Sequence, residues 1–454
     1  MKIMKMNRII KLSSLAVLLV LLVVNQGCKK FDYSELNGPT IGVDTTNADG
    51  AVLQTLVSGT EALSRQYISY YIDDVGVIGR EHYRFSNSEP RYLSDLLGSG
   101  SSTLNNNTFY ITNPWGFCYS VVKMGNILIA AAKHSNPVLI SDGDRLGYYG
   151  YAKTLQAYQL LMSFNLTDSI RVDVSNPNHL GPFLGHDAAL AAISALLDDA
   201  KTDLSDPSCA FSFVTTMNTG GPDPNTPADF LMFNRALAAR VAVYRKDWAG
   251  ALTDLEQSFI NKTPGADFYA GVYHVFSAAG NDFLNPVFFP LGTSGELRGA
   301  DAFYAQDILA NDDRINKAPL RSTVDQGDDS VYSQGGLTTD RDVFIYSSLI
   351  SPIAVIRNEE LILLDAEANL NMDNLNAFVS DINVIREGHG LTDYATGGAA
   401  ADMNELIYER RYSLAFEGHR WVDMRRWGLL GDIPIEREGD HVWTYFPIPL
   451  PETY

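Results

Sequence analysis

A mainly α-helical fold, built from helical pairs in a right-handed scaffold with long irregular insertions and few short strands, is predicted by three features. Apolar residues recur at spacings of three and four along most of the chain. Two helix–turn–helix units have the small residues and tight turns of tetratricopeptide pairs. Two stretches rich in Gly, Ser, Asn and Asp interrupt this periodicity and predict loops.

The predicted helices are amphipathic and follow one another from the N-terminal third of the chain to its end. Their ranges are 51–71, 114–133, 148–166, 188–204, 227–244, 248–259, 359–370, 375–386 and two shorter helices within 404–427. Thr226 and Pro227 supply an N-cap followed by proline at the first helical position. The two helix–turn–helix units, 227–259 and 359–386, are separated in sequence, so we expect a scaffold with insertions rather than a regular solenoid.

The two insertions lie near residues 73–112 and 264–351 of one predicted domain, 47–454. Stretches of this length without periodicity are usually functional or disordered, and their aromatic residues argue against disorder. Short strands are compatible with the second insertion, but the pattern does not place them. Function on such a scaffold usually lies in the loops.

The first residues predict a lipoprotein signal peptide over 1–27. Four basic residues precede an apolar run, Leu15 to Val24, that is shorter than the about 20 residues needed to span a membrane. Cys28 follows directly and is the expected lipidation site, with 28–46 as a flexible tether. The alternative is an ordinary secretory signal that contains a cysteine. Since no other apolar run reaches spanning length, we expect membrane attachment through the lipid alone.

Charge and motifs exclude several classes of function. The net charge of −20 argues against nucleic-acid binding, which relies on Lys and Arg. No nucleophile elbow, phosphate-binding loop or zinc motif occurs, and Cys118 and Cys209 are expected to be buried thiols. We predict no cofactor and no metal, because the acidic loop lacks the spacing of a calcium-binding loop. The aspartates of that loop are Asp312, Asp313, Asp325, Asp328 and Asp329.

A charged cluster is predicted near the C-terminus, in the stretch 404–427. On a helix, Arg410 and Glu417 share a stripe with apolar residues, where a charge is costly unless it is paired. We expect a partly buried structural ion network of Arg410, Glu417, Arg420 and Asp423, and expect loss of Glu417 to strand Arg410. The alternative is a catalytic cluster of Glu, His and Asp.

The same stretch, RRYSLAFEGHRWVDMRRWG followed by FPIPLPE at 446–452, resembles the C-terminal signature of the SusD/RagB family. The matching positions are Arg410, Leu414, Phe416, Glu417, Gly418, Arg420, Asp423, Arg426 and Trp427. Ser413 stands where the family usually has Glu, and Met424 replaces a Leu. The stretch 357–370, RNEELILLDAEANL, also resembles a family segment.

The resemblance implies a SusD-like fold and a surface-exposed outer-membrane lipoprotein, facing the cell exterior. Proteins of this family bind nutrients, mostly glycans, so the resemblance implies capture of an oligosaccharide and its delivery to a TonB-dependent, SusC-like transporter, without catalysis. Independently, the first insertion contains aromatic residues flanked by Asn, Asp and Arg, which suit the apolar faces and hydroxyls of sugars. Candidate ligand contacts are Tyr83, Arg84, Tyr92, Tyr110 and, from the second insertion, Tyr304.

Two other functions fit parts of the pattern. A lipid-anchored glycoside hydrolase would need two neighbouring carboxylates, and with 54 acidic residues such a pair is not excluded by sequence. A structural tetratricopeptide adaptor would need only the helical pairs.

The lipid anchor generates the first prediction. Cys28→Ala should release the protein from the membrane fraction, because the thioether that carries the lipid can no longer form. Fractionation of cells that express the variant measures this. Retention in detergent-soluble membrane would contradict the predicted anchor.

Overall fold

The computed structural model describes residues 47–176, 178–217, 220–280, 282–321 and 330–453. These residues belong to one compact unit that runs from Thr45 to Tyr454. The predicted signal peptide, the lipidation site Cys28 and the tether lie outside the described residues, so they stay predictions.

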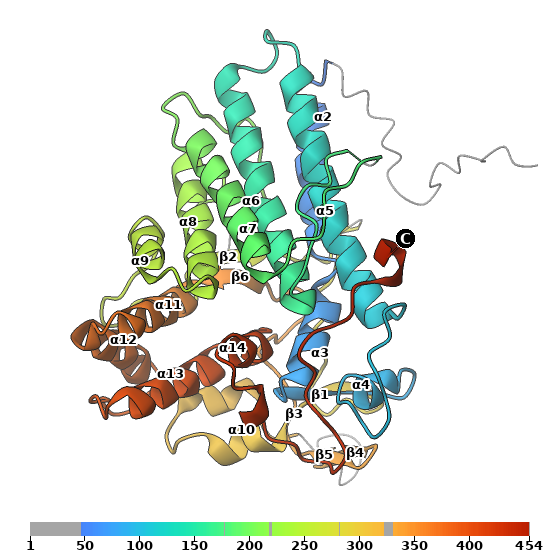
Figure 1. The fold of residues 1–454 in the computed structure, drawn as a ribbon, viewed down its shortest axis with the longest axis vertical. Helices are drawn as coiled ribbons and strands as arrows, with labels where there is room; N and C mark the ends of the chain where they lie inside the picture. Colours follow the sequence, from blue (N-terminus) through green and yellow to red (C-terminus); the bar gives the residue numbers. More distant parts are fainter. Residues whose placement is uncertain (1–46, 177, 218–219, 281, 322–329, 454) are drawn as a thin grey trace, which may run out of the picture. The chain divides into compact units, whose positions relative to one another are not determined.

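Helices dominate the described chain, as the sequence predicts, and successive helices pack against one another (Figure 1). The long antiparallel pair α5 and α6 packs on α2 and α7, and α8 continues the layer. The bounds are α2 Gly50–Ser64, α3 Ile68–Ile78, α5 Phe109–His134, α6 Asp142–Thr167, α7 His186–Leu204, α8 Pro227–Tyr244 and α9 Trp248–Glu256.

The second group of helices comes from the last quarter of the chain. It comprises α11 Asn358–Asn371, α12 Leu375–Gly388, α13 Ala399–Ser413 and α14 Arg420–Arg426. Helix α11 packs on α8 and α9 as well as on α12 and α13. The two predicted helix–turn–helix units are therefore neighbours in space, although the second insertion separates them in sequence. The mainly α prediction is confirmed.

Local signals explain where several helices begin and end. The Thr226 hydroxyl accepts a hydrogen bond from the Asp229 N–H (3.1 Å), so Pro227 opens α8 as predicted. Ser141 and Asp144 form a reciprocal capping box at the start of α6. Lys246 has a φ of 59° and turns the chain between α8 and α9. The predicted helix over 51–71 is wrong in one respect, because a turn divides it into α2 and α3.

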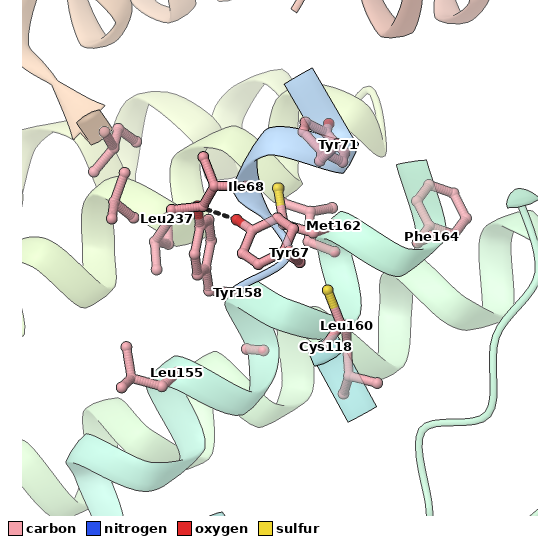
Figure 2. Close-up of a cluster of buried hydrophobic side chains, with 14 of the residues drawn as sticks. Tyr67, Ile68, Tyr71, Cys118, Leu155, Tyr158, Leu160, Met162, Phe164 and Leu237 are labelled. Carbon is pink, nitrogen blue, oxygen red and sulfur yellow. Dashed lines mark hydrogen bonds between the residues drawn. The ribbon is translucent and has the colours of Figure 1, made fainter. Parts of the chain in front are cut away.

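The main core lies where α3, α5, α6 and α8 meet (Figure 2). Its apolar side chains include Ile68, Cys118 and Leu237. Tyr67 and Tyr158 share a hydrogen bond of 2.7 Å between their hydroxyls, which satisfies two polar groups in this apolar setting. The prediction of a buried thiol holds for Cys118, whereas Cys209 is only half-buried.

The two insertions pair with each other through strands that the sequence did not place. Strand β1 (His82–Ser86) runs antiparallel to β3 (Glu296–Ala300). Two further strand pairs occur: β4–β5 lies within the second insertion, and β2 of that insertion pairs with β6, Ile353–Arg357, which directly follows it. The remaining elements of the insertions are α4 Arg91–Ser94, β2 Gly271–His274, α10 Ala302–Asp307, η1 Asp313–Lys317, β4 Tyr332–Gln334 and β5 Leu337–Thr339.

The C-terminal helix is shorter than predicted, and this changes its ion pairs. Helix α13 ends at Ser413, and Phe416 (φ 66°) and Gly418 (φ 85°) turn the chain before α14. Arg410 pairs with Asp423, at 2.8 Å between Nε and Oδ2. The expected Arg410–Glu417 pairing is wrong, because the turn carries Glu417 away from the stripe of α13.

Arg426 extends the network from α14 to α11. Its Nη2 donates to Glu367 Oε2 (2.6 Å), and its Nε donates to Asp423 Oδ1 (2.9 Å). Arg410 and Arg426 lower the pKa of Asp423 to about 2, although burial opposes this shift. Of the four residues predicted for the network, only Arg410 and Asp423 pair with each other, and Arg426 joins them through Asp423; Arg420 forms no ion pair among the described residues.

The turn at Phe416 is held by an acid from the first insertion. Glu81 Oε1 accepts a hydrogen bond from the Phe416 N–H (3.0 Å). Burial raises the pKa of Glu81 to about 7, against the lowering effects of the Phe416 N–H and Arg420. The proton is therefore held more tightly in the folded state than in the unfolded chain.

The described residues contain one apolar helix of spanning length and no cluster of side chains placed to hold a metal. Among the described residues, helix α5 is the one helix long and apolar enough to cross a membrane, so the expectation that no other apolar run reaches spanning length is wrong. Half of its most apolar window is buried inside the fold, as in a core helix. No group of three or more His, Cys, Asp or Glu side chains placed to hold a metal occurs in this part of the chain. Asp325, Asp328 and Asp329 lie outside it.

The raised pKa of Glu81 predicts a pH dependence of stability. Since its folded pKa exceeds the ordinary 4.5, protonation favours the fold, and this contribution is lost as pH rises from about 4.5 through 7. Between pH 4.5 and 7.5 the wild type should lose on the order of 2 kcal/mol more unfolding free energy than Glu81→Gln. Denaturant unfolding at both pH values measures the difference. Asp199→Asn, at an exposed position, is the control, and equal losses in wild type and Glu81→Gln would contradict the assignment.

Candidate functional site

The structure places the four tyrosines predicted as ligand contacts in the interior. Tyr83, Tyr92, Tyr110 and Tyr304 are each at most 8% exposed. The hydroxyls of Tyr83, Tyr110 and Tyr304 are also hydrogen-bonded; for example, Tyr304 donates to the Arg314 carbonyl (2.5 Å). Because a stacking platform must be exposed, this arrangement does not favour these tyrosines as ligand contacts.

Arg84, the fifth predicted contact, is likewise part of the structure that joins the insertions. Its guanidinium donates to Glu296 (2.8 Å) and to the Phe85 carbonyl (2.6 Å). It also lies over the Tyr92 ring, 5.3 Å from the centroid. The pairing of β1 with β3 therefore uses the residues that the sequence suggested for a ligand.

A different pocket, of about 690 Å³, opens beside the second insertion. We call it the Tyr269 pocket. It is formed by the segment before β2, η1, the segment before β6, the end of α12 and the turn before α14. Its lining includes Asp267, Phe268, Tyr269, Asp313, Asn316, Lys317, Phe344, Tyr346, Arg357, His389 and Glu417.

The wall of the pocket is aromatic. Tyr269 is 61% exposed, the only lining aromatic among the large exposed apolar residues of the described chain. One face of its ring lies over the Arg357 guanidinium, 5.4 Å from the centroid. Such a cation–π contact holds the ring while leaving much of it open to a ligand. Phe268 packs near His389, with 5.3 Å between ring centroids.

The floor is a paired charge network centred on Arg357, at the end of β6. Its Nη2 and Nε donate to the two carboxylate oxygens of Glu417, at 2.7 and 3.0 Å. Nη2 also donates to the Ser413 carbonyl (2.6 Å), and Nη1 pairs with Glu359. Arg357 is 2% exposed, so this bidentate pair is what allows its charge to be buried.

His389 continues the network from α12 to the rim. Its Nε2 lies 2.8 Å from Glu359 Oε1, and its Nδ1 lies 2.7 Å from Asp313 Oδ1. Burial opposes ionisation of Glu359, but Arg357 and His389 hold its pKa well below the usual range. The carboxylate of Asp313 is 60% exposed, so it closes the network at the water-facing side.

Lys317 supplies a cation from the other side of the pocket. Its Nζ donates to the Ser413 carbonyl and lies 3.8 Å from Glu417. Burial lowers the pKa of Lys317 to about 8, and the neighbouring Glu417 opposes this shift. Lys317 therefore stays mostly charged at neutral pH.

Comparison with solved structures decides the fold. A SusD superfamily protein from Bacteroides vulgatus superposes with a TM-score of 0.67 at 16% identity, covering 90% of this chain and 97% of that one. Surface glycan-binding protein A from Bacteroides uniformis gives 0.64 at 13%, covering 88% and 96%. The protein of that name from Bacteroides thetaiotaomicron, in complex with laminarihexaose, gives the same values. Residues 347–448 match the model of the SusD family.

This chain has the SusD fold. The resemblance predicted from the C-terminal signature is thereby confirmed, and the matched segment contains β6 and α11 to α14. Comparison with curated proteins finds no match.

On this SusD fold, the Tyr269 pocket combines an open aromatic wall with paired charges and exposed polar groups. Asp267, Asp313 and Asn316 are exposed at its rim. Aromatic faces bury the apolar faces of a ligand, and carboxylate and amide groups accept or donate hydrogen bonds to hydroxyls. The arrangement suits a neutral polyhydroxylated ligand, and the described residues offer no metal-binding cluster here.

The sequence did not single out Tyr269 as a candidate ligand contact. The available signal was local, since Tyr269 follows Gly265 and Asp267 in a turn-forming segment with no helical period. Its position over Arg357 depends on residues far apart in sequence. No local sequence pattern predicts the contact between Tyr269 and Arg357.

The corrected pairing of Glu417 predicts a stability effect. Glu417→Ala should lower the free energy of unfolding by about 3 kcal/mol, because it leaves the buried Arg357 with Glu359 as its one carboxylate partner. Denaturant unfolding measures the change. Asp199→Ala removes an exposed ion pair with Lys153 and should cost under about 1 kcal/mol. Equal effects of the two variants would show that the Arg357 network is solvated.

Proposed function

We propose that this protein captures a carbohydrate without transforming it, and that the ligand binds in the Tyr269 pocket. The observation that carries the proposal is the exposed Tyr269 ring, held by Arg357 above a floor of paired charges. A sugar ring stacked on Tyr269 would bury its apolar face and direct its hydroxyls toward Asp313 and Asn316. The pocket volume of about 690 Å³ lies in the range of small-molecule sites.

The hydrogen bonds made by the carboxylates of the pocket favour binding of a glycan over its hydrolysis. A glycosidase needs one protonated and one ionised carboxyl group free to act on the substrate. Both carboxylate oxygens of Glu417 accept hydrogen bonds from Nε and Nη2 of Arg357, and Asp313 is engaged by His389. These carboxylates are therefore held by the protein's own side chains rather than left free to act on a substrate.

The structural neighbours add support of a different kind. Two of them are named surface glycan-binding proteins, and one holds laminarihexaose. We infer a lipid-anchored position at the outer membrane, facing the cell exterior, and delivery of the ligand to a TonB-dependent, SusC-like transporter. Labelling of intact cells with a membrane-impermeant reagent tests the orientation. A structural adaptor that faced the periplasm would stay unlabelled.

The pocket generates a binding prediction. Tyr269→Ala should weaken binding of the recognised oligosaccharide at least tenfold, about 1.4 kcal/mol, because the stacking surface is lost. A glycan array that includes laminarihexaose identifies the ligand. Isothermal titration then measures the affinity of the wild type and of Tyr269→Ala for that ligand. The exposed position of Tyr269 predicts little change in stability.

Tyr445→Ala is the matched control, since Tyr445 is 50% exposed and does not line this pocket. It should bind as the wild type does. Equal affinity of wild type and Tyr269→Ala would contradict the site, and release of new reducing ends from the bound glycan would contradict capture without catalysis.

A further inference from the structure

A second cavity, of about 350 Å³, lies between α13 and α14 and is separate from the Tyr269 pocket. We call it the Arg420 cavity. Its lining includes Arg410, Arg411, Arg420, Asp423, Met424 and Trp427. The neighbouring helices α13 and α14 are seen together in Figure 1.

Three arginines line this cavity, and each has a nitrogen that no group of the described residues satisfies. Arg410 Nη1, Arg411 Nε and Arg420 Nε are buried and have no hydrogen-bond partner among the described residues. The Arg410 side chain is 1% exposed. Buried donors of this kind are rare in folded proteins, and each one needs an explanation.

Arg420 differs from the other two because the described chain gives it no ion pair at all. Arg410 is neutralised by Asp423, and Arg411 donates to Asp307 (2.8 Å). The acids that interact with the charge of Arg420 are Glu81 and Asp301, but neither carboxylate lies within hydrogen-bond distance of the Arg420 guanidinium. Burial raises the pKa of both acids, so their negative charge is weakened in turn.

The acids that line the cavity do not cancel this charge. Asp423 is already shared by Arg410 and Arg426, at 2.8 and 2.9 Å. Asp432 is exposed at the edge, where water solvates it. One guanidinium charge therefore remains uncompensated inside a cavity that is large enough for a small molecule. Arg420 is half-buried, so its charge is only partly solvated, and an oxyanion from outside would relieve the resulting cost.

The rest of the wall is apolar. Met403 and Ile407 of α13, Met424 of α14 and Trp427 directly after α14 line the cavity. Arg426 lies over the Trp427 ring, 4.6 Å from the centroid, and Trp427 Nε1 donates to Glu367 (2.8 Å). The indole is thus held in place, and its orientation does not depend on a ligand.

We propose that the Arg420 cavity binds a small oxyanion, a carboxylate or phosphate, carried on an apolar body. The oxyanion accepts hydrogen bonds from Arg420 and its neighbour Arg411, and the apolar body packs between the methionines and Trp427. Guanidinium groups bind carboxylate and phosphate through paired N–H donors, which explains why arginines gather here. This site is independent of carbohydrate capture at the Tyr269 pocket.

Isothermal titration of the purified full chain with three probes tests the site. Benzoate and phenyl phosphate carry the two oxyanions on the same ring, and benzyl alcohol carries no charge. At least one anion should bind ten or more times more tightly than benzyl alcohol. The tighter of the two anions identifies the oxyanion. Equal binding of all three probes, or no binding of either anion, would overturn the proposal.

Two variants locate the binding. Arg420→Gln should weaken the better anion at least tenfold, and Arg91→Gln, at an exposed arginine outside the cavity, should leave it unchanged. Asn404→Trp keeps all three arginines and fills the cavity from an exposed position of α13, so it should also weaken the anion tenfold. Unchanged affinity in Asn404→Trp would overturn the assignment even if Arg420→Gln failed to fold.

Discussion

Pairing of buried arginine charge is the constraint that arranges the C-terminal half of this protein. Arg357, at the end of β6, is buried and is held by Glu417 in the turn before α14. Arg426 of α14 is held by Glu367 of α11. Since a buried guanidinium without a partner is strongly unfavourable, these pairs tie β6, α11 and α14 to one another. The apolar contacts between the helices allow many orientations, whereas bidentate pairs allow few.

The same constraint prepares the Tyr269 pocket. Glu417 and Glu359 hold the Arg357 guanidinium through ion pairs, so one face of the guanidinium is available to contact and orient the Tyr269 ring. The pocket therefore does not depend on loops alone for its shape. Its floor belongs to the rigid scaffold, and the insertion contributes the rim. A binding site built in this way keeps its aromatic wall in place before the ligand arrives, which reduces the ordering cost of binding.

Local signals predicted the helices well because they act within a few residues. The period of apolar residues and the Thr226–Pro227 start of α8 are of this kind. The geometry of the candidate site, in contrast, depends on contacts between residues that lie far apart in the sequence. Tyr83 lies in a loop-like stretch, yet the pairing of β1 with β3, from far along the chain, buries it. The wrong partner for Arg410 has a local cause, since the helix that would have aligned it with Glu417 ends at Ser413, before Phe416 adopts a left-handed conformation.

The chain from Glu417 in the turn to Arg420 at the start of α14 contributes to both pockets, and the different charges of these two residues explain why the pockets favour different ligands. Glu417 faces the Tyr269 pocket and is matched by Arg357, so a ligand there meets charges that are already paired. Neutral hydroxyls can hydrogen-bond to such groups without disturbing their balance. Arg420, just beyond Gly418, faces the other cavity and is matched by no group of the described chain. A neutral ligand there would leave the guanidinium charge uncompensated. An anion removes that cost, so the two cavities favour ligands of different charge although a single turn of the chain lines both.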